Sequence, residues 1–250
     1  MKKYTLLFVL LAGLVQAQTV PSSDAGYEIG GQVGDYSYRE NPNLMELHAD
    51  GLLAVHGAIT VDDILGLGPA RLEGRFVHAR TDYSSPSSGT SENSRNMYGE
   101  IRALRLNPMQ VAYGEIIPYY GLGIRRLYND LKDTATAFGY ERISTYIYAP
   151  LGVAYHSPQT NYGGMALSGE FAPLLYGRQY SGINDGIENN QTEGYHLRLT
   201  ALWENKQFQA GPYYQFWRVG DSDVDCSGSF CGVEPKNFTR EFGFSVSYKF

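Results

Sequence analysis

The last ten residues, Glu241-Phe242-Gly243-Phe244-Ser245-Val246-Ser247-Tyr248-Lys249-Phe250, alternate strictly between two kinds of side chain. Every even-numbered position is apolar and most are aromatic, whereas every odd-numbered position is polar, charged or glycine. Successive side chains of a β-strand point to opposite faces, so this period of two predicts a strand with one apolar and one polar face. Such a strand can belong to an ordinary β-sandwich or to a barrel that contacts lipid on its apolar side.

The same alternation continues through the rest of the chain. Each stretch that shows it is at least as long as the roughly 9–11 residues that a tilted membrane-spanning strand requires. Ten strands are predicted near residues 25–38, 44–59, 70–81, 96–106, 115–129, 140–156, 162–178, 194–204, 207–219 and 237–250.

The connections between these segments alternate in length. The even-numbered connections are mostly short, with somewhat longer turns near residues 60–69 and 107–114, whereas three odd-numbered ones are long and polar, covering residues 82–95, 178–193 and 220–236. Barrels of the outer membrane have short turns on the side of both termini and longer loops on the other side. The sequence therefore predicts an all-β fold, a single antiparallel up-and-down transmembrane barrel of ten strands, with eight or twelve strands as alternatives.

Composition excludes several other classes of protein. Of the 250 residues, 14% are aromatic and 18% are charged, which argues against disorder. The formal charge of −6 argues against a nucleic-acid-binding domain, which would show a basic face. Two cysteines are too few for a disulfide scaffold or a zinc ribbon.

The N-terminus has the features of a secretory signal peptide. Lys2 and Lys3 precede an apolar run from Leu6 to Val15, and Val15-Gln16-Ala17 has the small-x-small pattern of a cleavage site. We therefore expect residues 1–17 to be a signal peptide and residues 18–250 to form one barrel domain.

Together these features resemble the small outer-membrane β-barrel proteins of Gram-negative bacteria, the group that holds opacity-type adhesins, omptins and OmpX-like barrels. The terminal strand, the strand Tyr120-Gly121-Leu122-Gly123-Ile124-Arg125 and the continuous alternation carry this resemblance. It implies an outer-membrane location with extracellular loops and periplasmic termini, contact with outer-membrane lipid and lipopolysaccharide, and insertion by the barrel-assembly machinery. It also implies a membrane-assembly signal formed by Phe242, Phe244, Val246, Tyr248 and Phe250.

Strand parity predicts a polar network inside the barrel. Seven acidic and seven basic side chains are assigned to the lumen, and buried charges need partners. We expect a salt-bridged, largely closed interior, with a narrow pore as the alternative. The core of the predicted network comprises Glu46, His48, Asp50, Arg71, Glu73, Arg75, Glu100, Arg102, Glu170 and Arg198.

Glu46-x-His48-x-Asp50 is the strongest local candidate for chemistry. Residues two apart on a strand point the same way, so the three side chains could hold a metal with outside help or form an acid–base pair. Omptin-type proteases place an Asp and a His two apart near the outer mouth, opposite a second pair of Asp. Here the order is reversed and no second Asp pair is evident, so we expect no catalytic residues, no metal and no cofactor.

Cys226 and Cys231 lie in the last long connection with four residues between them. Export passes through an oxidising compartment, so we expect them to form a disulfide that stiffens this loop.

The sequence favours a surface-exposed barrel whose loops contact a host or cell-surface ligand, or an envelope structural protein. The alternatives are a narrow porin-like diffusion channel and, less favoured, an omptin-like protease.

Overall fold

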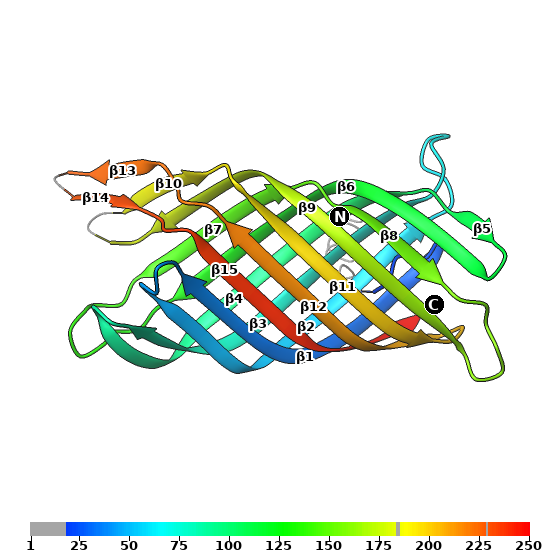
Figure 1. Ribbon diagram of the computed structural model, residues 1–250, viewed down its shortest axis with the longest axis horizontal. Helices are drawn as coiled ribbons and strands as arrows, with labels where there is room; N and C mark the ends of the chain where they lie inside the picture. Colours follow the sequence, from blue (N-terminus) through cyan, green and yellow to red (C-terminus); the bar gives the residue numbers. More distant parts are fainter. Residues whose placement is uncertain (1–18, 184–185, 229) are drawn as a thin grey trace, which may run out of the picture.

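The structure is a computed structural model that describes residues 19–183, 186–228 and 230–250. The predicted signal peptide, residues 1–17, lies outside the described residues. No helix in the described ranges is long and apolar enough to cross a membrane. The described residues form fifteen strand segments. They are labelled in Figure 1 and are β1 Gly26–Glu40, β2 Glu46–Val61, β3 Ala70–Ser85, β4 Gly89–Leu106, β5 Met109–Val111, β6 Gly114–Asp130, β7 Glu141–Tyr148, β8 Leu151–His156, β9 Gly164–Ser181, β10 Ile187–Gln191, β11 Gly194–Glu204, β12 Phe208–Val219, β13 Val224–Ser227, β14 Phe230–Val233 and β15 Asn237–Lys249.

Antiparallel pairing of neighbouring strands closes the sheet into a barrel. β1 pairs with β2 on one side and with β15 on the other, in a register that runs from Glu28 opposite Lys249 to Glu40 opposite Asn237. β7 and β8 form one path between β6 and β9, and β10 and β11 form one path along β9. The described residues therefore form a closed barrel of ten strand paths, one for each predicted segment.

The barrel has two unlike ends. We call the end where β1 begins and β15 finishes the terminal end, and the opposite one the hairpin end. Short connections 62–69, 157–163 and 205–207 join strands at the terminal end. β10, β13 and β14 project at the hairpin end, away from the C-terminus (Figure 1).

Two of the three predicted long loops are mostly strand. β3 and β4 continue past the predicted boundaries to a tip of three residues, 86–88, and β9 and β10 continue to the connection 182–186. Ser, Thr and Asn in these stretches provide no apolar face, so their sequence lacks the alternation that marks the rest of each strand. The backbone ladder nevertheless continues on both pairs of strands, with one register shift between Thr81 and Tyr83 in the pairing of β3 with β4.

The barrel is apolar outside and polar inside. The exposed outer positions form a continuous belt that includes Val33, Leu53, Phe76, Phe242 and Phe244, whereas the inner positions are mainly polar or charged. Soluble monomers rarely expose an apolar surface of this extent, and lipid-facing walls of membrane barrels do. The belt is therefore the surface that contacts the hydrocarbon region of a membrane.

Large aromatic rings fit inside the barrel where a neighbouring strand provides glycine. The fully buried ring of Tyr148 packs against Gly123, where an added Cβ atom would lie 2.2 Å from the ring carbon Cζ. Tyr119 packs against Gly152 in the same way. Glycine at these two inward positions is thus a packing requirement.

Candidate functional site

A chain of ion pairs crosses the lumen toward the terminal end. Arg71 from β3 pairs with Glu28 at 2.7 Å and with Glu73 at 2.8 Å. Arg102 from β4 bridges Glu73 at 3.0 Å and Glu170 of β9 at 2.9 Å. All five side chains are buried, so each charge depends on its partners rather than on water.

A second group surrounds Glu241 of β15. Its carboxylate is 2.9 Å from a guanidinium nitrogen of Arg75 and 3.7 Å from one of Arg125. The Tyr98 hydroxyl donates a hydrogen bond of 2.5 Å to the same carboxylate, and the Arg125 guanidinium lies 4.0 Å from the Tyr98 ring centroid. Two buried arginines therefore share one carboxylate, and an aromatic face stabilises the second of them.

The third group joins β4, β7, β11 and β12. Arg198 pairs with Glu100 at 2.9 Å, and the Tyr148 hydroxyl donates to the same carboxylate. His196 stacks on Trp217 with ring centroids 4.3 Å apart. Charged and aromatic side chains from four strands are therefore buried together at this level of the lumen.

Seven predicted network residues lie inside the barrel and are buried, namely Arg71, Glu73, Arg75, Glu100, Arg102, Glu170 and Arg198. Sequence analysis missed the roles of Tyr98, Tyr148 and Trp217 as partners of these charges. The alternation along their strands places these three side chains inside the barrel, so it could have indicated their roles. Buried Tyr and Trp side chains commonly provide a hydroxyl group or an aromatic ring as a partner for a cation.

The prediction for Glu46, His48 and Asp50 was wrong. The His48 and Asp50 side chains are 60% and 95% exposed, and the inward positions are taken by Leu47 and Ala49. The β2–β3 register shifts between His48 and Leu52, so a bulge reverses the parity of the outer part of β2. His48 and Asp50 hydrogen-bond each other at 2.7 Å on the outer wall.

The last connection closes the hairpin end. Glu234, which follows β14, reaches into the barrel and pairs with Arg142 of β7. Arg142 also lies 3.2 Å from Glu40, and the Tyr38 hydroxyl donates to Glu234 at 3.1 Å. Burial, reinforced by the nearby Glu40 carboxylate and opposed by Arg142, raises the pKa of Glu234 to about 7. The sequence carried no signal for this contact, because Glu234 lies in an irregular segment.

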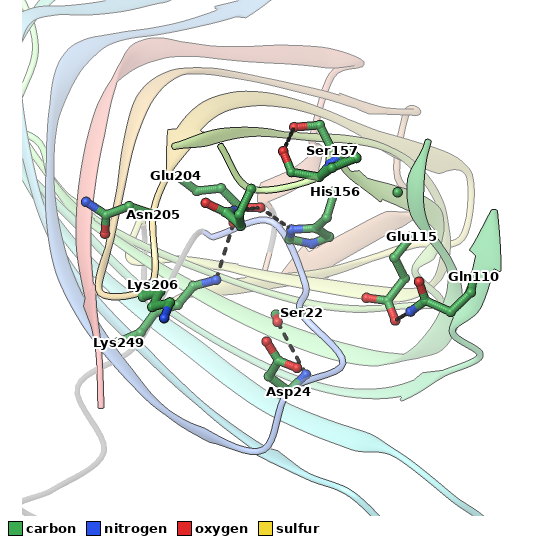
Figure 2. A pocket seen from close by; sticks show the side chains of 13 residues that line it. Ser22, Asp24, Gln110, Glu115, His156, Ser157, Glu204, Asn205, Lys206 and Lys249 are labelled. Atoms are coloured by element: carbon green, nitrogen blue, oxygen red, sulfur yellow. Dashed lines mark hydrogen bonds and ion pairs between the residues drawn. The ribbon is translucent and has the colours of Figure 1, made fainter. Parts of the chain in front are cut away.

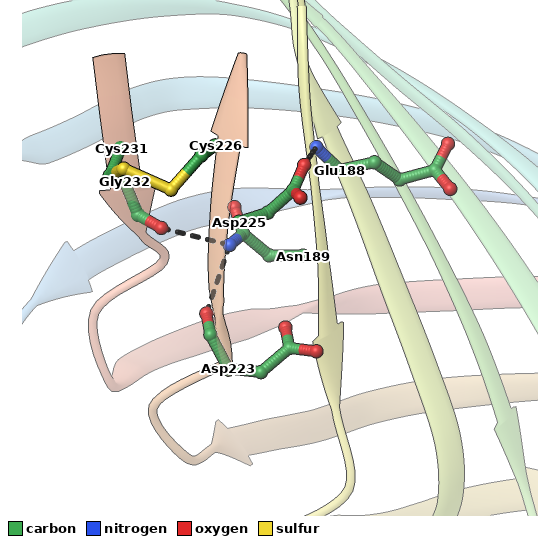
Figure 3. The surroundings of a disulfide bond; sticks show 7 residues. All are labelled: Glu188, Asn189, Asp223, Asp225, Cys226, Cys231 and Gly232. Carbon is green, nitrogen blue, oxygen red and sulfur yellow. Dashed lines mark hydrogen bonds between the residues drawn. A yellow bond between two sulfur atoms is a disulfide. The ribbon is translucent and has the colours of Figure 1, made fainter. Parts of the chain in front are cut away.

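The same connection carries a disulfide. Cys226 of β13 and Cys231 of β14 are directly opposite each other in this small hairpin and are bonded, as expected from the sequence (Figure 3). The β13–β14 hairpin is therefore closed both by backbone pairing and by a covalent link.

The β13–β14 hairpin is held against β10. The Asn189 side chain donates to the carbonyl oxygens of Asp223 at 2.9 Å and Gly232 at 3.1 Å (Figure 3). The Asp225 carboxylate accepts a hydrogen bond of 2.8 Å from the backbone N–H of Glu188. Hydrogen bonds thus join β10 to the connection that carries β13 and β14 at the hairpin end.

The terminal end contains a cavity of about 280 Å³ beside the first described residues (Figure 2). The Thr19 hydroxyl accepts a hydrogen bond from Arg71, and the Pro21 carbonyl oxygen lies 2.8 Å from Nε2 of His156. His156 pairs through Nδ1 with Glu204 at 2.8 Å, and Lys249 lies 3.4 Å from the same carboxylate. Residues 19–22 are buried, so they occupy the lumen at this end.

The described ranges contain no group of three or more His, Cys, Asp or Glu side chains that could hold a metal ion.

Comparison with known proteins shows which fold the chain has but identifies no family for it. No protein-family model matches the sequence, and no curated protein matches it. The structure is similar to the outer membrane protease OmpT from Escherichia coli, with a TM-score of 0.54, 11% sequence identity, and coverage of 93% of this chain and 99% of that one. It also matches the translocator domain of the autotransporter NalP from Neisseria meningitidis, with a TM-score of 0.44, 11% identity, and coverage of 99% and 95%. Such identities show the fold alone. With its lipid-facing belt, its polar lumen and ten strand paths in the described residues, the chain has the fold of an outer-membrane β-barrel.

Proposed function

We propose that this chain is a surface protein of the bacterial outer membrane that binds a partner through its hairpin end. The observation that carries the proposal is the occupied interior. Compensated ion pairs fill the middle of the lumen, Glu234 covers one end, and residues 19–22 occupy the other. An interior built in this way serves stability, which leaves the hairpins as the accessible surface on which a partner can bind. We place them outside the cell and the termini in the periplasm.

The hairpins suit binding because they are held in place. The disulfide and the hydrogen bonds to β10 fix the β13–β14 hairpin, which lowers the entropy lost when a partner docks. Val224 and Val233 face each other across this hairpin and are 65% and 46% exposed. Asp223 and Asp225 lie beside them, so the surface suits a partner with an apolar patch bordered by cations, carried by a host cell or another cell surface.

The test compares how two loop variants bind to cells. Residues 220–236 are replaced by a short turn, and a matched variant shortens the connection 131–140. We expect the first variant to lose binding to intact cells and the second to keep it, while heat-modifiable gel migration shows that both barrels are folded. Unchanged binding after every hairpin-end connection has been shortened would overturn the proposal.

A narrow diffusion channel is the second candidate, since charges of both signs line the lumen and a cavity of about 280 Å³ lies at the terminal end. Recording in planar bilayers separates the two candidates. A silent bilayer with folded protein supports the surface role. Stable unitary currents, altered by Arg102→Gln, would establish the channel instead.

We propose no hydrolytic role for His48 and Asp50. The support is their place on the outer wall, where the two side chains are largely exposed and do not line the lumen. Peptide cleavage that is abolished in His48→Ala would contradict this.

We also propose that the barrel-assembly machinery recognises the terminal strand. Phe242, Phe244 and Val246 face outward in β15, where another protein can contact them before lipid does. Removing Phe250 should lower the amount of assembled barrel in cells while refolding in detergent is unchanged. Equal loss in both settings would show a role in stability alone.

A further inference from the structure

Arg125 of β6 is a buried arginine whose guanidinium group is held in place but incompletely bonded. It lies 4.0 Å from the ring centroid of Tyr98 and 5.1 Å from that of Trp217, and the residue is 2% exposed. The Glu241 carboxylate oxygen is 3.7 Å from its Nη2 atom, which is too long for a hydrogen bond. Neither Nε nor Nη2 of Arg125 has a hydrogen-bond partner among the described residues. These two atoms form an edge of the guanidinium that binds anions in pairs, so an anion-binding edge of a buried cation is open.

Two further buried donors beside Arg125 also have no acceptor. The Tyr36 hydroxyl of β1 and the Asn96 amide nitrogen of β4 have no hydrogen-bond partner in the described part of the chain, and both residues are 0% exposed. Tyr36 is opposite Glu241 on β15, and the side chains of Arg125 and Asn96 are close enough to its hydroxyl to influence its ionisation. The Asn96 oxygen accepts a hydrogen bond of 2.7 Å from Asn129, which fixes the direction of its amide group. Four open donor atoms therefore belong to three adjoining side chains on β1, β4 and β6.

The buried charges around these donors do not balance. Glu241 is bonded mainly to Arg75, at 2.9 Å. Glu100, the other carboxylate that acts on Arg125, pairs with Arg198 at 2.9 Å. Three arginines therefore share two carboxylates, which leaves one positive charge in excess. A buried charge without a counterion is costly, so one additional negative charge at this point would stabilise the fold.

The chemistry of the open atoms defines the ligand as a small monovalent anion. All four atoms are donors, which a cation cannot use. A water molecule could accept hydrogen bonds from them but would leave the charge in excess, whereas a doubly charged anion such as sulfate would overcompensate it. Carboxylates that outnumber arginines elsewhere in the lumen are bonded within the groups around Arg71 and Arg142, toward the two ends of the barrel. A spherical ion suits donors that come from three strands, because it has no preferred direction.

We propose that the lumen holds one chloride ion, or a halide of similar size, between Arg125, Tyr36 and Asn96. The ion accepts hydrogen bonds from both open atoms of Arg125, from the Tyr36 hydroxyl and from the Asn96 amide. It neutralises the excess positive charge and links β1, β4 and β6 across the lumen. It is a counterion inside the wall of strands, so its binding is independent of what the hairpin end binds.

Equilibrium unfolding in urea, in potassium chloride and in potassium gluconate of equal ionic strength, tests the site. Equal ionic strength keeps general charge screening the same in both salts. The site variant is Tyr36→Phe, which removes one donor. The matched control is Tyr213→Phe, which removes another buried inward hydroxyl, 3.5 Å from a guanidinium nitrogen of Arg75 and outside the site. Each protein is refolded in the salt in which it is measured.

We expect chloride to stabilise the unsubstituted protein and Tyr213→Phe alike. For one site, each tenfold rise in chloride above its dissociation constant raises the ratio of folded to unfolded protein about tenfold. Tyr36→Phe should lose most of this dependence. In gluconate it should be at least as stable as the unsubstituted protein, because it removes a buried hydroxyl without a partner, whereas in chloride it should be less stable.

Two results of this experiment would overturn the proposal. One is an equal effect of chloride in all three proteins, which would show a general action of the salt. The other is an equal effect of Tyr36→Phe in both salts, which would show that a water molecule occupies the site.

Crystals of the unsubstituted protein grown in bromide give a second test that does not depend on the folding of a variant. Bromide scatters X-rays anomalously, so we expect an anomalous peak at hydrogen-bonding distance from Nε of Arg125. Density there without an anomalous signal would overturn the proposal. An anomalous peak without any chloride effect on unfolding would mean binding at crystal concentration only and would overturn it as well.

Discussion

Replacing Glu241 by glutamine tests whether the lumen is a dry, charge-compensated interior. Glu241 is 1% exposed and is the carboxylate that both Arg75 and Arg125 face. The substitution keeps the shape of the side chain and removes its charge. It leaves the guanidinium groups of Arg75 and Arg125 buried without the carboxylate that they share, and the other carboxylate near them, Glu100, already pairs with Arg198.

The expected loss of stability is large. Removing one partner of a buried ion pair typically costs about 3–5 kcal/mol, because the remaining charge stays desolvated. The Tyr98 hydroxyl also loses a charged acceptor at 2.5 Å, and hydrogen bonds to charged groups contribute about 1.5–3 kcal/mol. Since these contributions overlap, we expect a total decrease in the free energy of unfolding of about 4 kcal/mol.

Equilibrium unfolding in urea measures this, with the protein refolded into lipid vesicles and the folded fraction read by gel mobility. The matched control is Glu188→Gln, which breaks the exposed pair of Arg178 and Glu188 at the hairpin end. An exposed pair contributes at most about 1 kcal/mol, so this variant should unfold almost like the parent protein.

A loss below about 1 kcal/mol for Glu241→Gln would refute the reasoning, because it would mean that water reaches and solvates Arg75 and Arg125. The lumen would then be hydrated at its centre, and the case for a diffusion channel would strengthen.

Three further predictions concern the hairpin end and the packing of the wall. Burial raises the pKa of Glu234 from 4.5 to about 7, so its contact is most stable below about pH 4.5, where it is protonated in both the folded and the unfolded chain, and loses stability as the pH rises from about 4.5 to about 7; protection factors of residues 220–236, corrected for the intrinsic pH dependence of amide exchange, should fall over this range and then level off, and Glu234→Gln should abolish this change. Replacing both cysteines of the β13–β14 hairpin by serine should increase exchange in that hairpin alone, with an unchanged midpoint of barrel unfolding, because the bond spans a sequence separation of only 5. Gly123→Val should displace the ring of Tyr148 and cost about 1–3 kcal/mol in urea unfolding, whereas Gly99→Ala, where a Cβ atom meets nothing within 4 Å, should cost under 1 kcal/mol.

The strand count and the facing of most strands could be predicted because lipid and lumen impose opposite chemistry on alternate residues. The terminal strand shows this most clearly, with Phe242 and Phe244 outside and Glu241 and Ser245 inside. The same logic placed Arg71, Arg102 and Glu170 in the lumen. Where a strand leaves the membrane, as in the outer parts of β3 and β4, this constraint ends and the pattern disappears from the sequence.

The candidate site was less accessible to prediction, for two physical reasons. A bulge near Asp50 reverses parity without changing residue composition, so His48 was assigned to the wrong face. The contact between Glu234 and Arg142 joins an irregular segment to a strand 92 residues away, and alternation carries no information about such pairings.

The pairing of β1 with β15 has a consequence for how the barrel folds. Arg75 and Glu241 are separated by 166 residues in the chain, and the carboxylate reaches Arg75 only when the last strand joins the first. Before that step, a nine-stranded intermediate holds Arg75 and Arg125 without their anion, so it gains little from excluding water. Closure and desolvation should therefore occur together, in one late and slow step dominated by a long-range contact. A chain arrested before β15 would present two open strand edges, which makes it a natural target for periplasmic chaperones and proteases.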